Sequence, residues 1–384
     1  MLLEILKKMI ACRSISPNDD GTIPLIIEEL NKIGFISKTI SFGEGEEKVD
    51  NLYTRLGTKG PNLCFAGHTD VVPPGPLIEW RNDPFFCSVK DGIIYGRGTV
   101  DMKGAIAAFI TAAHRVMTTR PEILDLMSMS IMLTSDEEAI AINGTKKLLP
   151  WLEEQGEKID ACFVGEPVSR NTICDTIKIG ARGSATFFLE IFGKQGHVAY
   201  NEYADNAIAK LNKIINLFRA HTLHPGDSIF DASNMEMTNI IVGNEAENVI
   251  PGKAKLQFNI RYGDHHRAES LFANYQDILQ KHLNPEEFAF NYRSSGDAFV
   301  CKTEDFVQLV RESIKNIIGI EPEVNTAGGT SDARFIHKYC STLEVGLMGR
   351  TAHQVNECSS VNDLEILTRV YEGIILGYYE RISI

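Results

Sequence analysis

The sequence has little that would suit it to a membrane or to a nucleic acid. No apolar run reaches the roughly 18 residues that a membrane-spanning helix needs. Lys and Arg number 38 against 51 Asp and Glu, which gives a formal net charge of −13 and disfavours binding to polyanions. The first ten residues mix Glu4, Lys7 and Lys8 with apolar side chains, a pattern typical of an amphipathic helix and not of a signal peptide. We therefore expect a cytoplasmic protein with no nucleic-acid or membrane partner.

Two common cysteine and glycine motifs are also missing. The eight cysteines include no C-x-x-C pair, so free thiols in a reducing compartment are favoured over disulfides or a thiolate zinc site. The stretch Gly96-Arg97-Gly98 lacks the third glycine of the dinucleotide-binding fingerprint, and the strand before it is poor. A Rossmann-type nucleotide binder is therefore disfavoured, although it would otherwise compete.

The hydrophobic pattern predicts two domains, which suits a chain of 384 residues. Buried runs at 63–66, 129–134 and 160–164 are separated by helical patterns, which indicates an α/β fold with a mostly parallel sheet flanked by helices. Residues 181–293 instead follow the order β-α-β-β-α-β of a ferredoxin-like α+β domain. Because a buried-strand pattern returns at 343–347, we expect this domain to be inserted into a discontinuous one made of 1–180 plus 294–384.

Potential metal ligands stand where the predicted strands end. His68, Glu138 and Glu166 each follow a buried strand directly, Asp101 lies in a glycine-rich loop before a helix, and His353 lies beyond the run at 343–347. The carboxyl ends of strands surround the ligand crevice in open α/β sheets. Two imidazoles and three carboxylates suit a hydrolytic site for zinc or a related divalent metal.

Charge and spacing refine this hypothesis. Three carboxylates and a hydroxide balance two Zn²⁺ ions, whereas one ion would leave excess buried negative charge. Glu137 and Glu138 are adjacent and diverge, so that one could bind metal while the other acts as general base. In an extended chain His68 and Asp70 share a face, and the Asp70 carboxylate could accept the second ring N–H of His68. Taken singly, each motif could equally be an ordinary polar loop or acidic turn.

Longer motifs resemble one known family. They are Gly67-His68-Thr69-Asp70-Val71-Val72-Pro73-Pro74-Gly75, Tyr95-Gly96-Arg97-Gly98 through Asp101-Met102-Lys103-Gly104, Gly328-Gly329-Thr330-Ser331-Asp332-Ala333-Arg334-Phe335 and His353-Gln354-Val355-Asn356-Glu357. Together they are similar to the zinc-dependent aminoacylase and carboxypeptidase-like amidohydrolases, over nearly the whole chain. The resemblance implies a zinc-peptidase-like catalytic domain and a homodimer formed through the inserted domain.

The resemblance also implies a role for individual residues. Asp101 would bridge two zinc ions, for which Co²⁺ is expected to substitute, with His68 and Glu166 on one ion and Glu138 and His353 on the other. Glu137 would be the base and Asp70 a supporting group. His197, in Lys194-Gln195-Gly196-His197, would stabilise the oxyanion in the partner subunit's site. The implied substrate contacts are Arg182, Ser184, Tyr200, Asn248, Arg261, Thr330 and Arg334.

The same motifs favour a family member whose small N-acyl amino acid substrate bears carboxylates at both ends. Arg261 has separate support, because Leu256, Phe258 and Ile260 form an apolar strand face that leaves Arg261 on the polar one. Three positions depart from the family pattern: Ala139, Ala181 and Asn201. Another deacylase or peptidase of the family, such as an acetylornithine deacetylase, an aminoacylase or a dipeptidase, remains an alternative. A catalytically silent metal-binding scaffold is a further one, which the presence of Glu137 disfavours.

Overall fold

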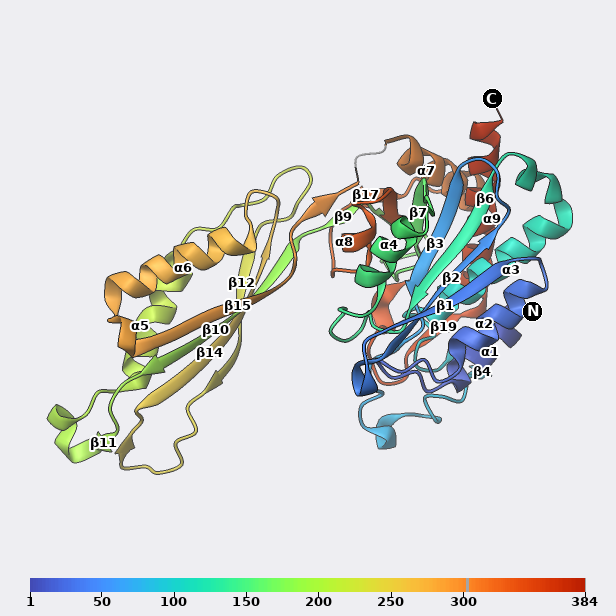
Figure 1. The fold of residues 1–384 in the computed structure, drawn as a ribbon. Coiled ribbons are helices and arrows are strands. Elements are labelled where there is room, and N and C mark those ends of the chain that lie inside the picture. Colours follow the sequence, from blue (N-terminus) through green and yellow to red (C-terminus); the bar gives the residue numbers. More distant parts are fainter. Residues whose placement is uncertain (302–303, 384) are drawn as a thin grey trace. The chain divides into compact units, whose positions relative to one another are not determined.

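The computed structural model describes residues 1–301 and 304–383, which form two compact units (Figure 1). The first unit comprises Met1–Ile179, Cys301–Asn325 and Ser331–Ile384, and the second comprises Gly180–Val300 and Thr326–Thr330. The second unit therefore extends beyond 293, where the hydrophobic pattern placed its end, because strand β15 (Phe288–Gly296) runs through that position. Among the described residues, no helix combines the length and the apolar character that a membrane crossing requires.

The first unit is built on an eight-stranded sheet in the order β1-β2-β6-β3-β7-β18-β8-β17. The strands are β1 (Ile36–Phe42), β2 (Val49–Leu56), β3 (Asn62–His68), β6 (Ser128–Thr134), β7 (Ala161–Val164), β8 (Thr176–Lys178), β17 (Glu323–Asn325) and β18 (Ser341–Glu344). The central strands β6, β3, β7 and β18 are parallel to one another. They are buried over almost their whole length, as the continuous apolar runs predict.

Helices cover both faces of this sheet (Figure 1). The main core joins it to α1 (Leu2–Ala11), α2 (Thr22–Asn31), α3 (Lys103–Thr119), α7 (Glu304–Ile318) and α9 (Val361–Ile382). Phe65 and Phe109 stack in its centre with ring centroids 4.5 Å apart. On the other face lie α4 (Thr145–Glu154) and the short α8 (Ala333–Ile336), and a small sheet is formed by β4 (Ser88–Lys90), β5 (Ile93–Tyr95) and β19 (Cys358–Ser360).

The second unit is a four-stranded antiparallel sheet with two helices. Its elements follow the order β10 (Gly183–Phe192), α5 (Ala207–Ala220), β12 (Asn234–Ile241), β14 (Lys253–Tyr262), α6 (Ala268–His282) and β15, and the sheet order is β12-β14-β10-β15. Apolar side chains that alternate along β10 and β14 form a separate core with the helices. The unit is completed by two short pairs: β11 (Gly196–His197) with β13 (Val249–Ile250), and β9 (Gly180–Ala181) with β16 (Phe299–Val300).

The predicted fold class is confirmed, with one local error. The apolar run at 343–347 was expected to form a single strand, but β18 begins at Ser341 and ends at Glu344. Val345 and Leu347 are nevertheless buried. The chain beyond β18 also keeps backbone hydrogen bonds: the Val345 N–H donates to Val164 O of β7 at 3.0 Å, and Leu347 O accepts the N–H of Ser169 at 3.1 Å. Burial alone cannot locate the end of a strand in a sequence.

Candidate metal centre

Three of the predicted ligands stand at neighbouring positions of the sheet edge. His68 is the last residue of β3, while Glu138 and Glu166 follow the ends of β6 and β7. Since these three strands are adjacent and parallel, their carboxyl ends deliver the side chains to one place. Asp101 comes from the loop before α3, and His353 from the loop between β18 and β19.

The Asp101 carboxylate lies between the two histidines. Its Oδ1 is 3.1 Å from His68 Nε2, and its Oδ2 is 3.1 Å from His353 Nε2. Glu166 Oε1 lies 3.8 Å from the same His68 nitrogen, and Glu138 Oε1 lies 2.9 Å from that of His353. The five side chains therefore form two three-ligand groups, His68–Asp101–Glu166 and Asp101–Glu138–His353, which share Asp101.

The ionisation of the centre reflects its density of charge. Burial disfavours a charged His68, but hydrogen bonding and attraction to Asp101 outweigh it and raise the pKa of His68. Hydrogen bonds to Asp101 and Glu138 raise the pKa of His353 to about 10. Desolvation raises the pKa of Glu166, and so does the negative charge of Asp101. In the protein alone, protons thus offset a concentration of buried carboxylates. Divalent cations would do so better, and the donor set of imidazole and carboxylate fits Zn²⁺ or Co²⁺.

The expected base, Glu137, lies beside this centre. Desolvation raises its pKa well above the ordinary value, and the negative charges of Asp332 and Glu138 add to the effect, whereas His68 and Arg334 oppose it. Asp332 is itself buried, and burial raises its pKa to about 6. Asp332 lies in the motif that runs from Gly328 to Phe335, but no pattern in the sequence predicted this electrostatic role.

The contacts of the Asp70 carboxylate differ from the predicted hydrogen bond to the His68 ring. His68 Nδ1 is 2.9 Å from the backbone carbonyl oxygen of Asp70 and 3.6 Å from the Asp70 carboxylate. The carboxylate instead accepts the backbone N–H groups of Glu137, at 3.3 Å, and Glu138, at 3.1 Å. It also accepts the hydroxyl hydrogen of Ser16, a residue for which no motif predicted a role. Asp70 therefore positions the two glutamates, and its peptide oxygen orients the histidine.

The remaining candidates lie in three places. Arg334 is in the first unit near Glu137 and stacks on Phe335 at 4.7 Å. In the second unit Ser184 and Arg261 are register partners on β10 and β14, and Arg182 donates to Asn234 Oδ1 at 3.0 Å. Thr330 belongs to this unit too. His197, Tyr200 and Asn248 gather elsewhere: the rings of His197 and Tyr200 lie 5.5 Å apart, and Val198 N–H donates to Asn248 O at 3.0 Å.

One departure from the family pattern has a structural reading. Ala181 is fully buried in β9, where its register partner is Phe299.

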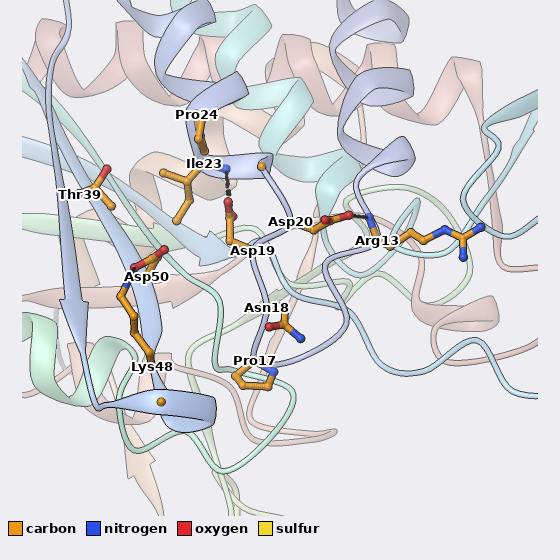
Figure 2. Close-up of a pocket in the computed structure, with 12 residues that line it drawn as sticks. Arg13, Pro17, Asn18, Asp19, Asp20, Ile23, Pro24, Thr39, Lys48 and Asp50 are labelled. Carbon is orange, nitrogen blue, oxygen red and sulfur yellow. Dashed lines mark hydrogen bonds and ion pairs between the residues drawn. The ribbon is translucent and has the colours of Figure 1, made fainter.

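A separate hollow of about 660 Å³ lies beside the N-terminal segment, and Figure 2 shows its lining. None of the predicted metal or substrate residues lines it. Its carboxylates already have partners: Asp19 accepts the N–H of Ile23 at 2.9 Å, and Asp20 accepts that of Arg13. Asp50 pairs with Lys48 at 3.1 Å. Volume alone therefore does not locate the chemistry of this protein.

Known proteins resemble the chain in both sequence and structure. Residues 64–377 match the model of peptidase family M20/M25/M40. Succinyl-diaminopimelate desuccinylase of Rhodopseudomonas palustris is 43% identical over 383 residues, 98% of each chain, and that of Bradyrhizobium diazoefficiens is 44% identical over 98% of this chain and 99% of its own.

Solved structures share the fold at lower identity. An M20 family metallo-carboxypeptidase from Sulfolobus solfataricus superposes with a TM-score of 0.79 at 18% identity, covering 99% of both chains. A dinuclear metal binding peptidase of Bacillus subtilis gives a TM-score of 0.71 at 15% identity, over 99% of this chain and 98% of its own. The sequence match, with the two ligand groups, identifies a metal-dependent amide hydrolase. The chain belongs to peptidase family M20/M25/M40.

Proposed function

We propose that this protein hydrolyses N-succinyl-LL-2,6-diaminopimelate to succinate and LL-2,6-diaminopimelate, a precursor of lysine and peptidoglycan. The observation that supports this most is the near full-length identity of 43–44% to enzymes named for that activity. The match covers both units, so it includes the candidate recognition residues as well as the metal centre. A cytoplasmic location is part of the proposal and fits eight cysteines that are all free.

Two zinc ions per subunit are proposed to occupy the two ligand groups, with Co²⁺ as a substitute. Asp101 faces both groups through different oxygens, which supports a bridging role. Divalent cations bound there would polarise the scissile carbonyl and lower the pKa of the attacking water. His68 and Glu166 would hold one ion, and Glu138 and His353 the other.

Glu137 is proposed to move the proton of the reaction. Its carboxylate would take a proton from the attacking water and deliver it to the amide nitrogen as the C–N bond breaks, so that the amine leaves neutral. Desolvation, which raises the pKa of Glu137, makes its carboxylate a stronger base. Asp70 would hold Glu137 in place through its backbone N–H.

Arginines of the second unit are proposed to recognise the substrate's carboxylates. One guanidinium nitrogen of Arg261, Nη1, is buried without a hydrogen-bond partner among the described residues. Desolvation lowers the pKa of Arg261, and the neighbouring charge of Arg182 lowers it further. Two guanidinium groups that repel each other in a partly buried place would be stabilised by a bound carboxylate. Ser184, Thr330 and Arg334 are further proposed substrate contacts.

The position of His197 supports a role in a second copy of the chain. Ser184 and Arg261 lie at one end of β10, whereas His197, Tyr200 and Asn248 lie beyond the other end. Eight residue steps of strand separate Ser184 from Phe192, roughly 26 Å. One small substrate cannot contact both groups within one second unit. We therefore propose a homodimer through residues 181–293 in which His197 stabilises the oxyanion in the partner subunit's site.

Amide hydrolysis of matched substrates tests the proposal. We expect N-succinyl-diaminopimelate to be cleaved with a kcat/KM about a hundredfold or more above that of its N-acetyl analogue or N-acetylornithine, because a buried site built for a carboxylate leaves polar groups unpaired without it. Chelator should abolish all turnover. Arg261→Ala should reduce the difference in kcat/KM between the succinyl and acetyl substrates. Arg219→Ala, a substitution on α5, should leave that difference unchanged. If either acetyl compound is cleaved with the same kcat/KM as the succinyl substrate, the proposed desuccinylase activity is refuted and only a broader amidohydrolase activity stands.

A further inference from the structure

We infer that the buried Arg97–Glu357 pair is a positioning device for one of the two metal positions, that of Asp101, Glu138 and His353. The inference rests on the proposed metal-dependent function. Neither residue is a metal ligand or a substrate contact in the proposal above. Both lie within motifs that the sequence contains, yet no sequence pattern gave either of them a role.

The Glu357 carboxylate gathers the backbone of the loop that presents Asp101. Its Oε1 accepts the N–H groups of Val100 at 2.7 Å and Asp101 at 3.1 Å. Its Oε2 accepts the N–H of Gly98 at 3.0 Å and a guanidinium N–H of Arg97 at 2.6 Å. Glu357 has no exposed surface. Three backbone donors converging on one carboxylate fix the path of this loop, as in other backbone anion sites.

Arg97 extends the same network to the segment that presents His353. Its Nη1 donates to Gln354 O at 3.3 Å, and its Nη2 donates to His353 O at 3.5 Å and to Pro73 O at 3.3 Å. The guanidinium lies over the Trp80 ring, 5.3 Å from its centroid, and Arg97 is 1% exposed. One ion pair thus connects the backbones of two metal-binding segments that are far apart in the sequence.

This connection matters more for one metal position than for the other. His68 ends a central strand and hydrogen-bonds the Asp70 carbonyl, and Glu166 follows the end of β7. His353 has no such support from the sheet: it lies in a loop, its φ is +62°, and its side chain is 51% exposed. Its placement relative to Asp101 depends on the loop contacts, of which the Arg97–Glu357 pair supplies several.

Stability alone does not account for this arrangement. A buried ion pair has a large desolvation cost, and well-packed apolar residues often stabilise a fold equally well. In this network most hydrogen bonds join the ion pair to the backbone of the two loops that carry Asp101 and His353. Groups that orient metal ligands in this way typically change metal affinity by 10–100-fold when removed.

Zn²⁺ titration of the metal-free, full-length protein against a competing chelator tests the inference without any turnover. We expect the unaltered chain to bind two ions. Glu357→Gln should bind the ion of Asp101, Glu138 and His353 roughly 10–100-fold more weakly, because its amide would present N–H groups to backbone donors. The other ion, which shares only Asp101 with this position, should weaken by a smaller factor. Arg97→Lys, which keeps the charge but loses the forked donor geometry, should weaken the ion of Asp101, Glu138 and His353 by a smaller factor than Glu357→Gln does.

Asp175→Asn is the matched control. The Asp175 carboxylate likewise accepts three backbone N–H groups, those of Arg170, Asn171 and Thr172, and none of these three residues is a proposed metal ligand. It should lower the unfolding temperature without altering Zn²⁺ affinity. Two ions bound with unaltered affinity by Glu357→Gln would overturn the inference, and if that variant does not fold, the same result for Arg97→Lys would do so. Absence of Zn²⁺ binding by the unaltered chain would instead refute the proposed function.

Discussion

The substitution Asp70→Asn separates two accounts of how the metal centre is held. If the Asp70 carboxylate oriented His68, as the H-x-D spacing suggests, its loss would weaken metal binding by 10–100-fold. In the structure, however, His68 Nδ1 meets the backbone oxygen of residue 70 at 2.9 Å, and the substitution leaves that oxygen in place. We therefore expect Asp70→Asn to retain both metal ions.

The effect should appear in turnover, because the carboxylate holds Glu137 and Glu138 by their backbone N–H groups. An asparagine offers one acceptor oxygen where the carboxylate offers two, so one of these donors loses its partner. A buried donor without a partner costs about 1–3 kcal/mol. If this cost falls on the productive position of Glu137, kcat should drop by about one to two orders of magnitude, since 1.4 kcal/mol is tenfold.

The assay is kcat and KM together with zinc content of the purified variant. Ser16→Ala is the matched control, because it removes a hydroxyl donated to the same carboxylate and leaves its charge and its bonds to the glutamates intact. It should lower kcat by less than tenfold. Loss of zinc from Asp70→Asn would refute this reasoning and favour instead the hypothesis from the sequence that the Asp70 carboxylate contacts His68 directly.

Three further predictions concern Glu137 as the base, the proton on His353, and the action of His197 across subunits. Glu137→Gln should keep about two zinc ions while losing nearly all activity, whereas Glu138→Gln and His353→Ala should lower metal content; zinc loss in Glu137→Gln would contradict its assignment as base. The pKa of His353 is raised to about 10, so below that pH zinc must displace a proton. Calorimetry in buffers of different ionisation enthalpy should show proton release at pH 7 and an affinity that rises with pH, and zinc binding without proton release would contradict this. Mixing inactive His197→Ala with inactive Glu137→Gln should restore some activity, since a mixed dimer can assemble one intact site, and no recovery despite demonstrated subunit exchange would exclude a histidine acting in trans.

Much of the architecture followed from local pattern. Strands buried on both faces must be apolar throughout, so β3 and β6 were readable as parallel-sheet strands. The alternation along β10 and β14 likewise distinguished the second unit. The pattern was less reliable where burial continues beyond the end of a strand, as at Val345 and Leu347, and at the end of the second unit, which β15 carries beyond residue 293.

Strand ends also predicted which side chains would meet. His68, Glu138 and Glu166 follow strands that are neighbours in the sheet, so a rule about parallel strands sufficed to place them together. Asp101 and His353 were also recognised as candidate ligands, but their sharing of one metal position was implied only by resemblance to a family, because each lies in a loop whose path no local periodicity describes.

The hydrogen bonds that hold these ligands in place could be identified only in the folded protein. The i, i+2 spacing correctly related His68 to Asp70 but could not tell whether a backbone oxygen or a carboxylate would reach the ring nitrogen. Nor could it show that Glu357 meets the backbone of Val100 and Asp101, more than 250 positions away in the chain. Sequence periodicity records which face of an element is buried. Hydrogen bonds from side chains to distant backbone leave no periodic trace, because any loop can supply the N–H groups, and only the folded path determines which loop does.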